Sequence, residues 1–326
     1  MFCRIMMIAV AMFCVTACGP MTFTIGSSPR GIKSSIVEKD ERSTSDRIAI
    51  VNVSGMIMNA RSSSFLSAGE HPVSLLHEQL EAAANDRKVK AIILRLNTPG
   101  GTVTASDAMY RELLRFKKRS NKPVVALMMD VAASGGYYLA CGADHIVAYP
   151  STITGSIGVI MQTMSFKPLM DKVGVSADAI TSGPNKDVGS PFNTMSNEHR
   201  KILKGLVDDF YKRFTGIVRE SRKGIPADKF DMVTDGRIFS GEQAVKLGVV
   251  DELGDVYDAW SKAKSLAGVS NAHLVTYHRP ASQPASPYSK AQASPTQQIN
   301  FAQFNFPDSF GDRVGFYYLW QPSLGK

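Results

Sequence analysis

A serine on a glycine-rich turn is the residue of this sequence best suited to covalent chemistry. Ser134 lies in the run DVAASGGYY at residues 130–138, where a predicted strand gives way to a predicted helix. A serine on such a turn has an accessible hydroxyl, the amide of the next residue can face a developing oxyanion, and a helix N-terminus favours negative charge. The pattern indicates a nucleophile for acyl transfer. Taken alone, it fits a helix N-cap equally well.

A second glycine-rich run also follows a predicted strand, which is where α/β proteins build their sites. It reads NTPGG at residues 97–101. Adjacent glycines let backbone N–H groups approach a ligand oxygen without a Cβ atom in the way. Because Pro-Gly-Gly by itself is usually only a turn, the functional interpretation of this run depends on its pairing with the serine run.

A serine nucleophile needs a base, and lysine fits the sequence better than histidine. A lysine takes the serine proton only when it is neutral. A free lysine has a pKa near 10.4, so about one in 2,500 is neutral at pH 7, whereas a desolvating shift of roughly 3 units makes about a quarter neutral. None of the histidines lies in the glycine-rich runs; they are His71, His77, His145, His199, His273 and His278.

Lys186 is the lysine with the most suggestive surroundings. It lies in TSGPNKD at residues 181–187, a loop of turn-forming residues that carries little hydrophobic content. Ser156, in TGSIGV at residues 154–159, could hold the lysine amine by hydrogen bonding. From spacing alone, Ser156 is better explained as a turn or cap residue.

The elements that must position these residues alternate along the chain. Apolar β-branched runs predict strands, and apolar residues at helical spacing predict helices. Alternating strands and helices of these lengths predict an α/β fold of parallel βαβ units. The longest helix is expected to carry Ile202, Leu206, Phe210, Phe214 and Ile217 on one stripe. Strands are expected at 48–53, 89–96 and 123–129, and helices at 73–84, 109–116, 196–222, 242–247 and 257–267.

The N-terminus has the pattern of an exported lipoprotein. A short positive start precedes an apolar run at residues 5–14, which is shorter than the roughly 20 residues that span a bilayer. The run ends in VTACG, so residues 1–17 look like a signal peptide cut before Cys18, whose thiol would be acylated. An uncleaved signal anchor is the alternative. Either case predicts a membrane-anchored body on the extracytoplasmic, periplasmic side, followed by a disordered tether at residues 18–46.

The rest of the chain divides by composition into a body at residues 47–268, a flexible linker at 269–300 and an aromatic C-terminal segment at 301–326. The aromatic segment could dock on the body, on a neighbouring subunit or on a lipid surface, and we favour docking within an oligomer. Once Cys18 and the signal are set aside, Cys141 is the only cysteine left, and we expect it to be a small apolar residue in a packed helix.

Overall composition limits the functional classes. With 326 residues and 44% hydrophobic content, the chain can form one large α/β domain or two modest ones. We interpret the formal charge of +8 as a mildly basic solvated surface rather than a site for acidic partners. The sequence has no zinc-ligand spacing, Walker loop or basic array interleaved with aromatics, so we expect no metal and no nucleic-acid partner.

Taken together, these motifs resemble the signal peptide peptidase A family, whose fold is of the Clp protease and crotonase type. The resemblance covers about residues 47–268. It implies repeated ββα units with a mainly parallel sheet. The matching runs, in order, are NTPGG (97–101), ASGGYY (133–138), TGSIGV (154–159), SGPNKD (182–187), DGR (235–237), GEQA (241–244) and LGVVD (247–251).

Carried over residue by residue, the resemblance makes Ser134 the nucleophile, Lys186 the general base and Ser156 the residue that orients the lysine. The amides of Gly101 and Gly135 would form the oxyanion hole. It also implies a ring-shaped homo-oligomer in which neighbouring subunits complete each site, with cleaved signal peptides and other hydrophobic peptides as substrates and no cofactor. Thr98 stands where the family often has serine, a departure that leaves the glycine geometry untouched.

Two other functions remain open on the sequence. A crotonase-type acyl-CoA enzyme shares the fold and uses two backbone amides as an oxyanion hole, but its substrates are cytoplasmic and the export signal argues against it. The other is a non-catalytic oligomeric scaffold that binds membrane proteins, in which Ser134 and Lys186 are retained but idle.

Overall fold

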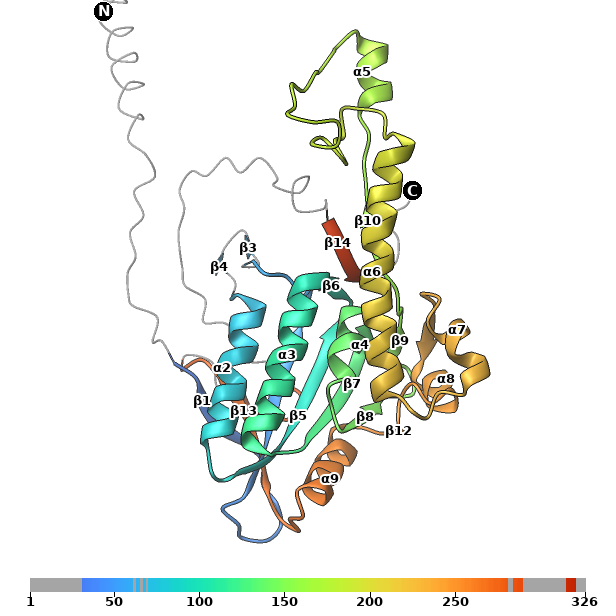
Figure 1. Cartoon of the computed structure of the whole chain (residues 1–326). Coiled ribbons are helices and arrows are strands. Elements are labelled where there is room, and N and C mark those ends of the chain that lie inside the picture. The colour runs from blue at the N-terminus through green and yellow to red at the C-terminus, as the bar shows by residue number, and fades with distance from the viewer. Residues whose placement is uncertain are drawn as a thin grey trace, which may run out of the picture.

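The central strands of the fold are apolar on both faces, as expected of a parallel sheet covered by helices. Three of them lie side by side: β2 (Arg47–Ser54), β5 (Val89–Thr98) and β7 (Val124–Ala133). All three strands predicted from the sequence are therefore present, and they pair in parallel. The computed structural model in Figure 1 describes residues 31–60, 63–64, 67–68, 70–280, 284–289 and 315–320.

The sheet widens on both sides of these strands to nine strands. On one side, β13 (His273–His278) pairs in parallel with β2, and β1 (Lys33–Glu38) pairs antiparallel with β13. Beyond β7 lie the shorter strands β8 (His145–Ala148), β9 (Ile153–Gly155), β11 (Ile238–Ser240) and β12 (Glu252–Leu253). The fold is α/β with a mainly parallel sheet, as predicted.

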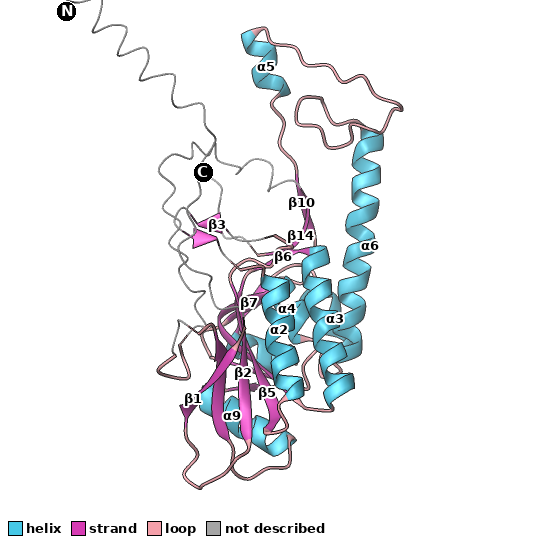
Figure 2. Cartoon of the chain, turned by 90° about the vertical axis from the view of Figure 1, so that its left-hand side faces the viewer, coloured by secondary structure: helices cyan, strands magenta, loops and turns pink. Residues whose placement is uncertain are grey.

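Helices cover both faces of this sheet (Figures 1 and 2). Alternate residues of β2 point to opposite layers: Val51 packs in the cluster of α2 and α3, whereas Ile50 packs in the cluster that includes Trp260 of α9. The core therefore has two apolar layers separated by the sheet. The helices are α2 (Pro72–Asn85), α3 (Val103–Ser120), α4 (Gly135–Ala140), α5 (Lys167–Val173), α6 (Asn197–Ser221), α7 (Phe230–Val233), α8 (Gly241–Lys246) and α9 (Val256–Leu266), with a 3-10 turn at Ala227–Lys229.

Residues 160–206, which we call the arm, extend away from the sheet (Figures 1 and 2). The arm includes α5 and the N-terminal half of α6. The sequence predicted one continuous buried stripe on α6, but Leu206 is 39% exposed while Phe214 is fully buried. The N-terminal half of the helix passes beyond the body, so nothing in the described chain covers it completely. No helix among the described residues is long and apolar enough to cross a bilayer.

A smaller antiparallel sheet and a short hairpin complete the described structure. In the smaller sheet, β14 lies between β6 and β10. The predicted aromatic segment is thus partly strand, and β14 docks on the body of its own chain. These strands are β6 (Gly100–Thr102), β10 (Ile160–Gln162) and β14 (Gly315–Leu319); the hairpin is β3 (Ser63–Ser64) and β4 (Ser67–Ala68).

The body extends beyond the boundaries drawn from composition at both ends. Residues 33–38, placed in the tether, form the edge strand β1, and residues 273–278, placed in the linker, form β13. The reason is pairing: β13 adds to the free edge of β2, and the Ser35 hydroxyl lies 2.8 Å from Nε2 of His278 across the outer pair. The predicted signal peptide at residues 1–17 and Cys18 fall outside the described residues.

Cys141 has the structural place expected from the sequence. It caps the C-terminus of α4 and is only 5% exposed. Burial raises the pKa of its thiol to about 11, which keeps the sulfur protonated and unreactive at neutral pH.

Candidate active site

Ser134 occupies the sharp turn between β7 and α4. Its backbone angles, φ 53° and ψ −112°, lie in a region that costs a non-glycine residue on the order of 1–3 kcal/mol. Two hydrogen bonds hold the turn: the Ser134 amide donates to the carbonyl of Gly155, and the Ser134 carbonyl accepts from the amide of Tyr138, both at 2.8 Å. These hydrogen bonds, one to β9 and one to α4, therefore hold Ser134 in its strained conformation.

The Ser134 side chain does not serve as a helix cap. It stands at the N-cap position of α4 but makes no cap hydrogen bond. The residue is 1% exposed, and its hydroxyl has no hydrogen-bond partner among the described residues. Buried polar groups in proteins nearly always have partners, so packing alone does not explain this unpaired hydroxyl. The N-cap explanation left open by the sequence is wrong.

The two glycine-rich runs meet beside Ser134. A Cβ on Gly100 would lie 2.6 Å from the amide nitrogen of Gly135, and a Cβ on Gly101 would lie 1.8 Å from the carbonyl oxygen of Ile57. Gly100 also has φ 96°. Thr98 supports the first run, because its hydroxyl donates to the carbonyl of Gly55 at 2.6 Å and accepts from the amide of Gly100 at 3.1 Å. Backbones can approach this closely only without side chains.

Ser156 lies one residue after the carbonyl that holds the Ser134 turn. It has φ 50° and is 9% exposed, and its amide donates to the carbonyl of Arg237 at 2.7 Å. The structure therefore brings Ser134, Ser156, Gly101 and Gly135 into one region at the ends of β5, β7 and β9.

Lys186 is not part of that region in the same chain. It is exposed in the loop of the arm, where its amide donates to the carbonyl of Gly183 at 3.2 Å. The loop is held near the start of α6 by the His199 ring, whose Nε2 lies 3.1 Å from the carbonyl oxygen of Pro184. One copy of the chain thus brings Ser134 together with Gly101 and Gly135, whereas Lys186 lies in the loop of the arm.

A tyrosine, an aspartate and an arginine form a polar network behind the site. Tyr138 donates its hydroxyl to Oδ1 of Asp107 at 2.7 Å, and Arg213 donates to the same oxygen at 2.6 Å. Burial alone would raise the pKa of Asp107, but hydrogen bonds from Tyr138, Arg213 and Arg111 outweigh burial and hold that pKa below its ordinary value. The network fixes α4 and α6 to α3.

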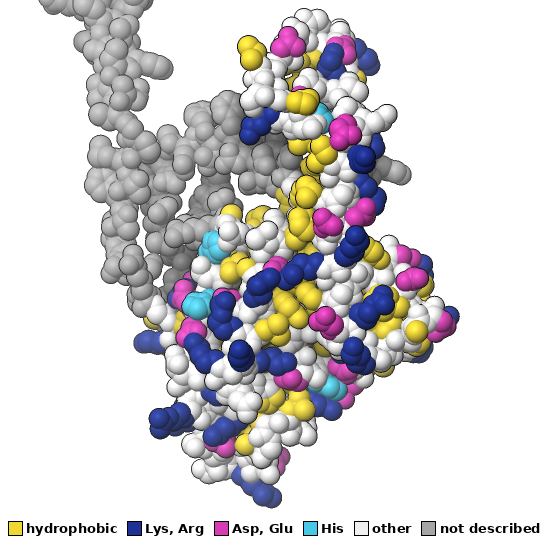
Figure 3. Space-filling model, viewed as in Figure 1, with side chains coloured by type: hydrophobic (Ala, Val, Ile, Leu, Met, Phe, Trp, Pro, Cys, Tyr) yellow, Lys and Arg dark blue, Asp and Glu magenta, His cyan; other side chains and the backbone are white. Residues whose placement is uncertain are grey.

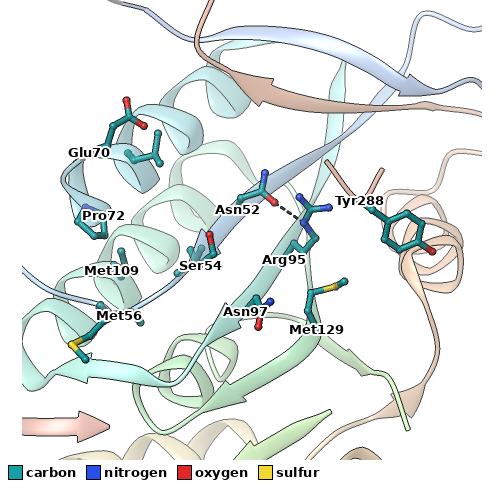
Figure 4. A pocket seen from close by; sticks show the side chains of 13 residues that line it. Asn52, Ser54, Met56, Glu70, Pro72, Arg95, Asn97, Met109, Met129 and Tyr288 are labelled. Carbon is teal, nitrogen blue, oxygen red and sulfur yellow. Dashed lines mark hydrogen bonds between the residues drawn. The ribbon is translucent and has the colours of Figure 1, made fainter. Parts of the chain in front are cut away.

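A cavity of about 220 Å³ lies at the ends of β2 and β5 and is lined by Asn52, Asn97 and Tyr288 among others (Figure 4). Arg95, 6% exposed, donates to Oδ1 of Asn52 and to the carbonyl of Ser289, both at 2.6 Å. Sequence reasoning missed Arg95, although a charge inside the apolar run AIILRLN was a usable signal. Among the described residues, no group of three His, Cys, Asp or Glu side chains could hold a metal.

Two protein-family models match the chain, and together they cover most of the described body. The model of peptidase family S49 matches residues 116–270, and that of Clp protease matches residues 47–154. A Synechocystis protein named "Putative protease" is 38% identical over 227 residues, which cover 70% of this chain and 76% of that protein. The chain belongs to peptidase family S49. Membership of family S49 makes it a serine-type peptidase, against the acyl-CoA alternative.

Other family S49 relatives confirm the resemblance to signal peptide peptidase A. "Putative signal peptide peptidase SppA" of Enterococcus faecium is 32% identical, with 73% of this chain and 69% of that protein covered. "Protease 4" of Salmonella typhi is 36% identical over 73% of this chain, and the chain spans only 38% of its length.

The glycine contacts predict the result of adding one methyl group. Gly101→Ala should lower kcat for peptide hydrolysis about 100- to 1,000-fold, the usual effect of losing one oxyanion donor, because the new Cβ must push β6 away from Ile57. Gly216→Ala is the matched control, since a Cβ on that helical glycine meets no atom within 4 Å. Circular dichroism would verify folding, and an active, folded Gly101→Ala enzyme would contradict the assignment.

The low pKa of Asp107 predicts a pH dependence of stability. An aspartate whose folded pKa lies below its unfolded value of about 3.9 stabilises the protein above that value and loses the contribution as the pH falls through the folded pKa. Asp107→Asn should therefore lower Tm clearly at pH 7, and its difference from wild type should shrink as the pH falls below the unfolded pKa. Asp228→Asn, at an exposed position, is the control. A Tm difference that is constant from pH 7 to pH 3 would argue against this network.

Proposed function

We propose that this chain is a membrane-associated serine endopeptidase that cleaves signal peptides and other hydrophobic peptides through Ser134 and Lys186, with an acyl-enzyme intermediate. The observation that carries the proposal is the buried hydroxyl of Ser134, which has no partner among the described residues and adjoins the glycine amides. A nucleophile held ready in this way has lost its hydration before the substrate arrives.

The chemistry is acyl transfer. Oγ of Ser134 attacks the peptide carbonyl carbon while the neutral amine of Lys186 takes the hydroxyl proton. The amides of Gly101 and Gly135 stabilise the oxyanion of the tetrahedral intermediate. Lys186 then protonates the leaving amine, and the same steps with water as the attacking group release the acyl product and regenerate the serine.

A neighbouring copy supplies the lysine in this proposal. Lys186 stands on the arm, away from the Ser134 of its own chain, and the arm exposes apolar side chains that suit an interface (Figure 3). Closing such an interface over the lysine would remove water from its amine, which favours the neutral form that a base requires. The exposed apolar residues of the arm include Leu169, Val173, Val175, Ile180 and Phe192.

The proposed association with a membrane is supported by the N-terminal sequence. The apolar run at residues 5–14 and Cys18 are expected to export the chain and attach it to lipid on the periplasmic side. A tethered peptidase would meet hydrophobic segments where they leave the bilayer. The printed name of the Enterococcus relative, a signal peptide peptidase, supports this class of substrate.

Hydrolysis of a synthetic signal peptide by the full chain tests the dyad. Ser134→Ala and Lys186→Ala should each lower kcat/KM at least about a thousandfold, because either change removes a group that acts in proton transfer or attack. Lys172→Ala, at another exposed lysine of the arm, should stay near wild type. Full activity of a folded Ser134→Ala protein would reject the nucleophile, and full activity of Lys186→Ala would reject the base.

Mixing the two inactive variants tests the shared site. If Ser134 and Lys186 act across an interface, subunits that are dissociated, mixed in equal amounts and reassembled should regain about one quarter of the wild-type sites. Each site needs Ser134 from one copy and Lys186 from its neighbour, and half of the copies retain each residue. Size-exclusion chromatography with light scattering would follow reassembly. Reassembled mixtures without activity would show that each chain must supply both residues.

A further inference from the structure

The cavity beside Arg95 holds a buried positive charge whose hydrogen bonds within the described chain all go to neutral oxygens. Arg95 is 6% exposed, and its described acceptors are one side-chain amide and two backbone carbonyls. Among the described residues that line the cavity, Glu70 has the only carboxylate, and that group pairs with Arg279. Buried charges are normally paired, because an opposite charge offsets the free energy lost when an ion leaves water.

A turn of the chain at residues 286–289 contacts both terminal nitrogens of the Arg95 guanidinium. A hydrogen bond from the Ser289 amide to the Ser286 carbonyl, at 3.0 Å, closes the turn. Nη1 of Arg95 donates to the carbonyl of Pro287, and Nη2 donates to the carbonyl of Ser289 at 2.6 Å. A single carboxylate offers arginine the same arrangement, two oxygens on two neighbouring nitrogens. The turn therefore places neutral carbonyls where an anion fits.

The cavity has the size and the opening that the end of a peptide needs. Its volume of about 220 Å³ is below the roughly 300–1,000 Å³ of clefts for drug-sized ligands, which suits the last residue or two of a chain. Ser54 and Met56 belong to the lining and are exposed, so the cavity opens to solvent. Nε of Arg95 donates to Oδ1 of Asn52 at 2.6 Å, and this bond fixes the plane of the guanidinium (Figure 4).

The cavity adjoins the backbone of the candidate active site. Ile57 lines the cavity, and its amide donates to the carbonyl of Gly100 at 2.8 Å. The carbonyl of Ile57 accepts from the amide of Thr102 at 2.8 Å, so the lining residue is paired with β6 on both sides of Gly101. A ligand in the cavity therefore lies against the strand that carries one of the proposed oxyanion donors.

We propose that this cavity binds the free C-terminal carboxylate of a peptide substrate, which replaces the carbonyls of Pro287 and Ser289 on Arg95. The inference rests on the proposed function and adds a specificity determinant to it. A peptide whose chain ends near the cleaved bond is preferred to one whose chain continues. The preference arises because a carboxylate forms charge-assisted hydrogen bonds with the buried guanidinium, and these are stronger than the bonds to neutral carbonyls.

Peptide binding to the full chain carrying Ser134→Ala tests the inference without cleavage. By fluorescence anisotropy, a labelled signal peptide with a C-terminal carboxylate should have a Kd at least about tenfold lower than the same peptide with a C-terminal amide. Adding Arg95→Gln should abolish this difference, and circular dichroism would verify folding. Adding Arg115→Gln, at a 63% exposed arginine, is the control and should preserve it.

Two results of the binding experiment would overturn the inference. Equal Kd values for the acid and the amide in the protein that retains Arg95 would do so, whether or not the Arg95 variant folds. A preference that survives in a folded Arg95→Gln protein would do so as well.

A third peptide distinguishes the chain end from a carboxylate on a side chain. It carries the C-terminal amide and has aspartate as its last residue. This peptide should bind like the plain amide. Binding as tight as that of the free acid would overturn the assignment of the cavity to the chain end.

Hydrolysis by the wild-type chain separates failure of this inference from failure of the proposed function. Both the acid and the amide should be cleaved, the acid with at least about tenfold higher kcat/KM through a lower KM. If both are cleaved with equal kcat/KM and bind equally, the inference is overturned and the proposed function stands. If wild type cleaves neither peptide, both are overturned.

Discussion

The close approach of two backbones, possible only where side chains are missing, is the constraint on which the site depends. Gly100 and Gly101 pass so near Gly135 and Ile57 that a single methyl group on either of the first two would overlap main-chain atoms. Van der Waals repulsion rises steeply at such distances, so the geometry tolerates no gradual adjustment. The β6 strand, the amides beside Ser134 and the path of β14 all follow from this contact.

The same contact explains why strain at Ser134 is tolerated. The backbone of a serine at φ 53° would relax to a common conformation if its neighbours were free. Here the carbonyl of Gly155 accepts a hydrogen bond from the Ser134 amide, and α4 starts immediately after this residue. The hydrogen bonds that Asp107 accepts from Tyr138 and Arg213 hold α4 against α3 and α6. The rigid surroundings thus hold the hydroxyl in a position that the local chain would not choose.

Sequence reasoning located the parts of the site that depend on local patterns. The central strands were recognisable as apolar runs, and parallel strands end at one edge of a sheet, so the runs around Gly101 and Ser134 had to meet. It did not predict β1, β13 or β14, since these short strands form only where the edge of a sheet pairs with them. The place of Lys186 depends on the direction of the arm, which no local pattern encodes. The clamp by Arg95 likewise joins residues almost 200 positions apart.

Helix α6 connects the body of the protein to the arm that carries Lys186. Its 25 residues form a rod about 37 Å long. In its second half, the Phe214 ring contacts the ring of Tyr318, and the Phe210 carbonyl accepts a hydrogen bond from the Tyr318 hydroxyl. In its first turn, His199 contacts the loop that carries Lys186. Because a helix is stiff along its axis, a tilt of α6 at Phe214 would also displace the arm and the loop that carries Lys186.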